Sequence, residues 1–134
     1  MHVKQIAQSL SVSTDTVRYY TRIGYLSPIR NRNNDYKEYG QKELDRMRFI
    51  LGARQLGFSV EDLGLFIKEA SKGRAPCPIV RDLVNHRLKE TEQRFKEAQA
   101  LRNRMKKAVR DWEDKPNEVP TGNMVCHLIE NFNG

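Results

Sequence analysis

Two cysteines, at positions 77 and 126, are the side chains with the greatest capacity for chemistry in this sequence. Cys77 lies between Pro76 and Pro78. Because proline suits the first turn of a helix, we expect Cys77 at or near the N-cap of a long helix. The dipole of that helix favours a thiolate, which binds metal ions or attacks electrophiles. Cys126 lies beside His127 in a short apolar tail. The two thiols therefore indicate metal binding or thiol-based sensing.

A metal site would need more donors than the two thiolates. Two thiolates and one oxygen or nitrogen ligand suit zinc or a softer divalent ion such as cadmium, lead or mercury. The candidates for the additional ligand are Asp114, Glu113, His127 and His86. Other interpretations stay open. Cys126 could be a buried core residue, Cys77 could react with oxidants or electrophiles, and the apolar tail could hold an organic ligand.

A second set of side chains, near the N-terminal end, is suited to nucleic acid. Residues 3–10 carry apolar side chains at helical spacing, and Ser13 is a good N-cap for a second helix that ends near Gly24. Tyr20 shares a face of this second helix with Val17, which favours packing in the core. The polar side chains of the second helix can donate hydrogen bonds to base edges and phosphates, as a recognition helix does: Thr14, Thr16, Arg18, Tyr19 and Arg22.

Residues 28–40 predict a small hairpin. Asn33, Asn34 and Asp35 supply a turn, because Asn and Asp tolerate positive φ. The flanking segments, Ile29–Arg30 and Tyr36–Tyr39, are expected to pair as strands. The tip is suited to the DNA backbone or minor groove through Arg30, Asn31, Arg32, Asn33 and Lys37. Together with the two helices before it, this hairpin predicts a winged helix-turn-helix.

The longest element must join these two sets of residues. After Pro78 no glycine or proline occurs before Pro116. With Thr91 filling one gap, apolar residues recur three or four positions apart at Val80, Val84, Leu88, Phe95, Ala98, Leu101, Met105, Ala108 and Trp112. This narrow seam predicts a coiled-coil helix about 50 Å long. Such a helix favours a homodimer, parallel or antiparallel, over a helix that lies along its own domain.

We therefore expect a mainly α-helical chain in four segments. These are a winged helix-turn-helix domain at 1–70, a linker at 71–77, a dimerisation helix at 78–113, and an effector-binding loop and tail at 114–134. The 24 Lys and Arg residues outnumber the 17 Asp and Glu residues, and the net charge of +7 favours an anionic partner. With no apolar run of membrane-spanning length and no signal peptide, we expect a cytoplasmic protein that does not enter a membrane.

Two other classes of function deserve comparison. An enzyme is not expected, because the sequence has no phosphate-binding loop, no nucleophile–histidine–aspartate order and only three scattered histidines. A coiled-coil adaptor that binds another protein would explain the long helix but would leave the basic hairpin without a role. The residues therefore favour a DNA-binding regulator.

The first half of the chain closely resembles the MerR family of bacterial regulators. The matching motifs are VRYY at 17–20, Gly24-Tyr25-Leu26, NDYKEY at 34–39, and the segments RMRFI and LGFSVEDL. The resemblance implies a homodimer whose long helices pair antiparallel. It also implies binding to promoter DNA, which such a regulator bends and untwists for RNA polymerase when an effector binds.

The resemblance also assigns DNA contacts to individual residues. The matching positions are Thr16, Arg18, Tyr19 and Tyr20 on the recognition helix, and Tyr36 and Lys37 on the wing. The wing departs from the family, which usually has Gly-Tyr-Arg-x-Tyr where this chain has Asp35-Tyr36-Lys37-Glu38-Tyr39. Lysine keeps the charge of arginine but loses its planar fork. Glu38 places a negative charge near the expected phosphate contacts.

The resemblance extends to the effector. In an antiparallel dimer the start of one long helix approaches the end of the other, so Cys77 is expected to meet Cys126 of the partner subunit. A cysteine at the helix start resembles the divalent-metal-sensing members, whereas copper-sensing members typically lack it. Divalent-metal sensors usually carry another cysteine at the end of the long helix, where this chain has Asp111–Asp114. The implied ligands are Cys77, Cys126, His127 and Asp114.

Overall fold

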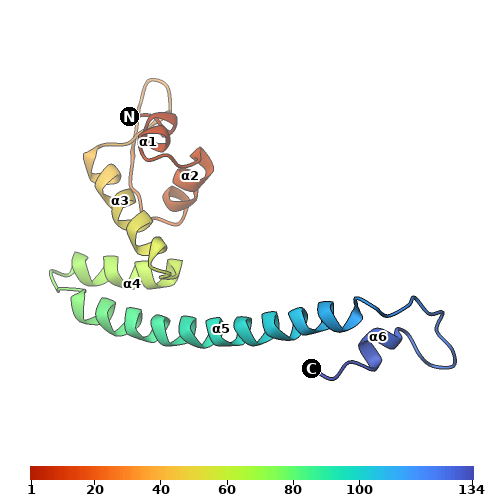
Figure 1. Cartoon of the computed structure of the whole chain (residues 1–134). Helices are drawn as coiled ribbons and strands as arrows, with labels where there is room; N and C mark the ends of the chain where they lie inside the picture. Colours follow the sequence, from red (N-terminus) through yellow and green to blue (C-terminus); the bar gives the residue numbers. More distant parts are fainter. The chain divides into compact units, whose positions relative to one another are not determined.

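The fold is mainly α-helical, as the sequence predicts (Figure 1). The computed structural model describes all residues from 1 to 134. In chain order the elements are α1 (Val3–Ser9), α2 (Thr14–Arg22), β1 (Ile29–Arg30), β2 (Lys37–Glu38), α3 (Gln41–Gln55), α4 (Val60–Ser71), α5 (Cys77–Trp112) and α6 (His127–Glu130). None of these helices combines the length and the apolar character that a bilayer crossing requires.

The chain divides into two compact units, Met1–Arg87 and Leu88–Gly134. The first unit contains α1 to α4, the hairpin and the first turns of α5. Its core takes apolar side chains from nearly every element, and the largest fully buried ones are Phe58, Phe66, Ile6, Met47, Ile50, Leu63 and Val17. The rings of Phe58 and Phe66 meet edge to face at 5.1 Å. This packing fixes α2 and the hairpin on one rigid support.

The helix-turn-helix begins and ends where the sequence predicts. The Ser13 hydroxyl accepts a hydrogen bond from the Thr16 backbone N–H at 3.1 Å, which caps α2. After α2, Gly24 adopts a φ of +88°, a left-handed conformation that favours glycine. The turn between α1 and α2 contains Ser11 at a φ of +55°. These local signals set the angle at which α2 leaves the turn.

Two carboxylates cap later helices from within. Glu43 accepts a hydrogen bond from the Gly40 N–H at 2.9 Å, and Asp62 accepts one from the Ser59 N–H at 3.0 Å. Ser59 returns the bond, since its hydroxyl accepts from the Asp62 N–H at 3.1 Å. Both carboxylates are buried. The N-terminal ends of α3 and α4 are therefore capped by buried carboxylates.

The hairpin forms as predicted, with Ile29 opposite Glu38 and Arg30 opposite Lys37 in antiparallel register. Its tip is folded by side chains as well as by backbone. The Asn31 amide oxygen accepts from the Asn33 N–H at 2.8 Å, and the Asn34 amide oxygen accepts from the Tyr36 N–H at 3.1 Å. Asp35 takes the positive φ, at +59°.

The apolar seam of α5 divides into three parts, where the sequence predicts one continuous surface. At the start of α5, Ile79, Val80, Leu83 and Val84 are half-buried against the core of the first unit. In the middle, Leu88, Phe95, Leu101, Met105 and Val109 are exposed. Near the end, Ala108 is buried, and Trp112 meets the ring of Phe132 edge to face at 5.8 Å.

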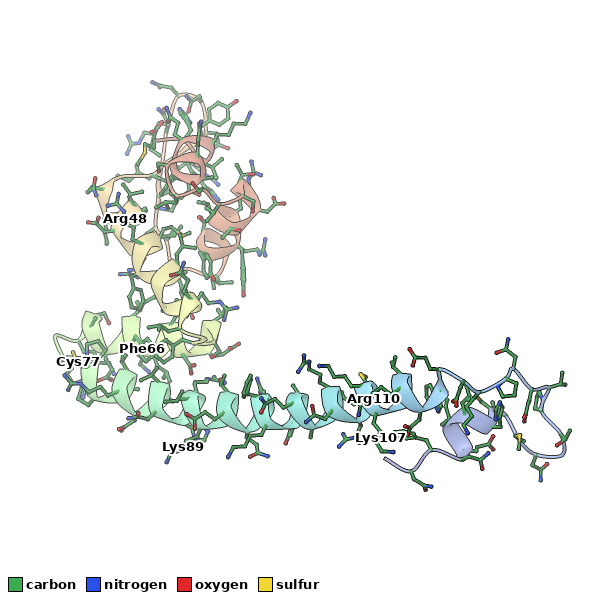
Figure 2. The ribbon with its side chains drawn as sticks, viewed as in Figure 1. Arg48, Phe66, Cys77, Lys89, Lys107 and Arg110 are labelled. Carbon is green, nitrogen blue, oxygen red and sulfur yellow. The ribbon has the colours of Figure 1, made fainter.

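The C-terminal segment accounts for the last part of this division. The Lys107 ammonium donates to the Asn133 carbonyl and the Asp111 carboxylate, both at 2.8 Å, and lies 5.4 Å from the centre of the Phe132 ring. Figure 2 labels Lys107 on the side of α5 that the chain end approaches. Ala108 is buried and Trp112 contacts Phe132, so Val109 takes their place in the exposed strip, which consists of Ala98, Leu101, Met105 and Val109.

Candidate nucleic-acid interface and effector end

The outer face of α2 is polar and pre-arranged. Arg18 is exposed, and its guanidinium donates to the Thr14 hydroxyl at 3.3 Å and lies 3.6 Å from Asp15. Arg22 is also exposed and stacks over the Tyr19 ring at 5.5 Å from its centre. The structure therefore brings four of the predicted contact residues together in two pairs, Thr14 with Arg18 and Tyr19 with Arg22. Such groups can bind phosphates and base edges.

Tyr20 lies in the core, as the face that it shares with Val17 predicts, and its assignment to the DNA contacts stays a prediction. Tyr20 is 7% exposed, and its ring stacks on those of Tyr19 and Tyr25, with distances between ring centres of 5.1 Å and 6.2 Å. Its position next to Val17 on the inner face of α2 explains this burial. Tyr20 thus supports the Tyr19 ring from behind.

Tyr25 connects this aromatic stack to α4. Its hydroxyl donates to the Val60 carbonyl at 2.7 Å. Burial, together with the nearby charge of Glu61, raises the pKa of the Tyr25 hydroxyl, so it remains a protonated donor. A Cβ on Gly64 would meet the Tyr25 hydroxyl oxygen at 2.5 Å, so glycine leaves the space that this bond needs. The stack that supports α2 is therefore fixed to the first residue of α4.

Two threonines on α2 have different surroundings. The Thr16 hydroxyl lies 2.9 Å from the Ser13 hydroxyl at the start of the helix, where it is half-buried but close to the polar face. The Thr21 hydroxyl donates to the Val17 carbonyl and lies 2.8 Å from the Tyr39 hydroxyl. Both contacts are on the side of α2 that faces the core. The Thr21–Tyr39 contact joins α2 to the end of the hairpin, a link that the sequence did not indicate.

The wing presents its charges unequally. Arg30 lies 3.4 Å from the Asp35 carboxylate, so part of its charge is neutralised within the hairpin. Arg32, Tyr36 and Lys37 are exposed, while Asn31 is half-buried because its side chain organises the tip. Glu38, whose charge is unfavourable near phosphate, lies 3.4 Å from the His2 ring nitrogen and so turns toward α1.

A partly buried ion pair connects α4 to the first turns of α5 within the first unit. Arg87 donates to the Asp62 carboxylate at 3.1 Å, and the Asp62 side chain is 13% exposed. Burial would raise the pKa of Asp62, but the hydrogen bonds from Ser59 and Arg87 outweigh it and leave that pKa below its ordinary value. The sequence analysis did not predict the contact between Asp62 and Arg87.

The two cysteines lie in different units and both are free thiols. Cys77 is the first residue of α5 and is exposed, one position later in the helix than an N-cap, with Pro78 second (Figure 2). Cys126 is the N-cap of α6 and is half-buried, and its thiol makes no capping hydrogen bond. Both sulfur atoms therefore remain available as ligands.

Three of the other candidate ligands, Glu113, Asp114 and His127, line a cavity at the end of α5, whereas His86 lies in the first unit. The Trp112 and Phe132 rings also line this cavity. One ring nitrogen of His127, Nε2, lies 2.9 Å from the Pro116 carbonyl, and the other lies 3.6 Å from the Glu118 carboxylate. No group of three or more His, Cys, Asp or Glu side chains in this chain is arranged to hold a metal ion.

Comparisons with known proteins agree with this architecture. The family described as "MerR HTH family regulatory protein" matches residues 1–70, and the one described as "MerR, DNA binding" matches residues 44–108. The transcriptional regulator HmrR of Rhizobium leguminosarum is 31% identical over 110 residues, which cover 81% of this chain and 84% of the relative. A probable heavy metal-dependent transcriptional regulator of Haemophilus influenzae is 24% identical, with both chains covered in full.

A solved structure has the same fold. The transcription regulator PbrR691 of Ralstonia metallidurans, in complex with lead(II), matches with a TM-score of 0.73 at 18% identity and covers 98% of both chains. The first family match takes in α1, α2, the wing and α3, which are the elements that build the polar surface described above. The chain therefore belongs to the MerR family of helix-turn-helix transcription regulators.

Proposed function

We propose that this protein acts as a homodimer that binds promoter DNA through α2 and the wing of each subunit and responds to a thiophilic divalent metal ion. The observation that supports the dimer is the exposed apolar strip of α5 together with Phe95 before it. Phe95 is 62%, Met105 57% and Val109 66% exposed in the single chain. Side chains of this kind along one helix face favour a partner helix. Two basic heads on one dimer suit the two half-sites of an operator.

The charges along α5 favour an antiparallel pair. Residues 98–110 carry five cations and no acid, whereas residues 77–97 carry five cations and four acids. A parallel dimer would place the two cationic segments against each other. An antiparallel dimer places each one opposite the acidic residues Asp82, Glu90 and Glu92 of the other chain, which lowers the repulsion.

We assign the DNA contacts to the polar side chains on the outer face of α2 and on the wing. Arg18, Tyr19 and Arg22 would lie in the major groove, with Thr14 and Thr16 at the front of the helix. Arg30, Arg32, Tyr36 and Lys37 would contact the backbone, with Asn31 shaping the wing. Tyr20 acts from within the core by supporting Tyr19.

The donor chemistry fits a soft divalent ion. Cys77 and Cys126 are both free, and thiolates prefer zinc, cadmium, lead or mercury to harder ions. Because one chain does not assemble three donors, we assign the site to both subunits, with Cys77 of one and Cys126 of the other. Asp114 and His127 are the candidates for a further ligand. A relative named as heavy metal-dependent and a structural neighbour in complex with lead(II) support a metal response. When bound, the ion would supply only a cross-link between subunits.

Metal titration of the purified dimer tests the proposal. We expect wild type to bind zinc or cadmium, with cadmium giving a thiolate charge-transfer band, and we expect Cys77→Ser and Cys126→Ser each to weaken binding by at least tenfold. Ser71→Ala, which removes an exposed hydroxyl at the end of α4, is the control. Unchanged affinity in both cysteine variants would refute the metal response, and reaction of Cys77 with peroxide would then indicate a thiol-based sensor.

A further inference from the structure

The side chain of Cys126 is left free by an unusual capping arrangement. Cys126 is the N-cap of α6, with φ of −147° and ψ of 116°, and the residue at this position normally uses its side chain to cap the helix. The thiol makes no such bond. Some other group must therefore hold the backbone of Cys126 in place, because an isolated four-residue helix has little stability of its own.

The Glu130 carboxylate is that group. One of its oxygens, Oε2, accepts hydrogen bonds from the Cys126 N–H at 2.8 Å and from the Val125 N–H at 3.0 Å. In the opposite direction, the Glu130 N–H donates to the Cys126 carbonyl at 3.0 Å. Three hydrogen bonds thus connect Glu130 with two consecutive residues, and two of them are strengthened by the charge of the carboxylate.

We propose that Glu130 is a positioning residue for the effector site. It fixes the backbone of Cys126 so that the thiol is presented in one direction, and it does not contact the metal ion. This inference rests on the proposed function, in which Cys126 is a ligand. Without the carboxylate, the 125–126 peptide groups are free to rotate, and the metal must order them as it binds. The groups behind a metal ligand typically contribute ten- to hundredfold to affinity. Because the Glu130 bonds are exposed, we expect the lower end, about tenfold.

Two substitutions separate positioning from ligation. Glu130→Ala removes both acceptor bonds. Glu130→Gln keeps an acceptor oxygen for the backbone N–H groups but offers a neutral amide, which is a poor ligand for a soft ion. If Glu130 positions Cys126, Gln should retain most of the cadmium affinity that Ala loses. If Glu130 is itself a ligand, both variants should lose affinity equally. Glu97→Gln, which removes the same charge from an exposed position on α5, is the control.

The test combines cadmium affinity, measured by competition with a chromophoric chelator, with two measurements on the metal-free protein. Glu130→Ala should bind cadmium about tenfold more weakly at an unchanged thiolate band. Its Val125 and Cys126 amide protons should exchange faster with solvent, while affinity for operator DNA stays at the wild-type value. Wild-type cadmium affinity in Glu130→Ala would overturn the inference alone. Absence of binding in wild type would overturn the proposed metal response and this inference with it.

Discussion

The most informative single change is Asp62→Asn, because Asp62 both caps α4 and connects it to α5. Its carboxylate accepts hydrogen bonds from the Ser59 N–H and from Arg87, so it caps α4 and joins that helix to α5 at once. Asparagine has almost the same shape but carries no charge. It can keep one acceptor bond and leaves the Arg87 guanidinium without its counter-ion at this position.

The expected cost follows from the burial of each partner. A hydrogen bond between charged groups contributes about 1.5–3 kcal/mol when it is shielded from water. The Asp62 side chain is 13% exposed but the Arg87 side chain is 35% exposed, so solvent screens the pair in part. We therefore expect Asp62→Asn to lower the free energy of unfolding by about 1–2 kcal/mol at neutral pH.

The dependence on pH gives the prediction its sign. Because the pKa of Asp62 is lower in the folded protein than in the unfolded chain, its charge stabilises the fold at every pH above the unfolded pKa, about 4. This contribution disappears as the pH falls through the folded pKa. The difference in unfolding free energy between wild type and Asp62→Asn should thus be constant from pH 7 to pH 5 and shrink below pH 4.

Urea unfolding followed by circular dichroism at a series of pH values measures this difference. Asp45→Asn, which alters an exposed acid on α3, is the control and should change stability by less than about 0.5 kcal/mol. A difference between wild type and Asp62→Asn that stayed constant down to pH 3 would refute the electrostatic explanation. A difference of zero at pH 7 would show that the Asp62–Arg87 pair does not stabilise the fold.

Two further predictions concern the surfaces that meet DNA and the second subunit. Arg18→Ala should weaken operator binding by about 1–3 kcal/mol and nonspecific binding by less, whereas Arg48→Ala on α3 should leave their ratio unchanged in a gel shift over a range of salt. Leu101→Glu should weaken dimerisation. Leu101 is 45% exposed in the single chain, so dimerisation can bury about half of this side chain. Its loss should cost about half of the 1.5–3 kcal/mol for burying a leucine in each chain, which for two chains raises the Kd of the dimer roughly thirtyfold. Sedimentation checks this, and a dimer of wild-type affinity would remove the α5 strip from the interface.

Local signals allowed much of the first unit to be predicted. The Ser13 cap, the left-handed Gly24 and the turn at Asn33–Asp35 each depend on residues close in sequence, and all three were confirmed. The capping roles of Glu43 and Asp62 are also local, and a glycine or serine three positions before each acid is the signal that was not used. The Arg87 contact is not local and had no such signal.

The seam of α5 shows why periodicity alone was insufficient. Spacing of three and four places Val84, Met105 and Ala108 on similar faces, but it does not say what covers each one. The core of the first unit covers Val84, nothing within the chain covers Met105, and Ala108 is buried near the returning C-terminal segment. Residues at the 108 and 112 positions were therefore assigned to the seam incorrectly, because the contact between Trp112 and Phe132 spans 20 positions along the chain and has no local pattern.

The site residues were also predictable only where a local sequence pattern determines their position. The helical spacing of α2 placed Arg18 and Arg22 on its polar face, and they are exposed. The same spacing placed Tyr20 beside Val17 on the face that packs in the core. The ligand set proposed at the other end of α5 draws on two chains. Sequence reasoning reached its cysteines by their chemistry, but it had no access to the hydrogen bonds from Glu130 that hold one of them.

The folded tip of the wing has a consequence for how the protein recognises a duplex. Asn31 and Asn34 already bind the backbone of their own loop, so the tip does not have to become ordered on contact. A wing that is rigid before it binds tolerates little variation in the width of the DNA groove, because it cannot change its conformation to follow the phosphates. The hydrogen bonds of these two asparagine side chains stiffen the wing. They would thereby make binding depend on the shape of the DNA at base pairs that the protein does not contact.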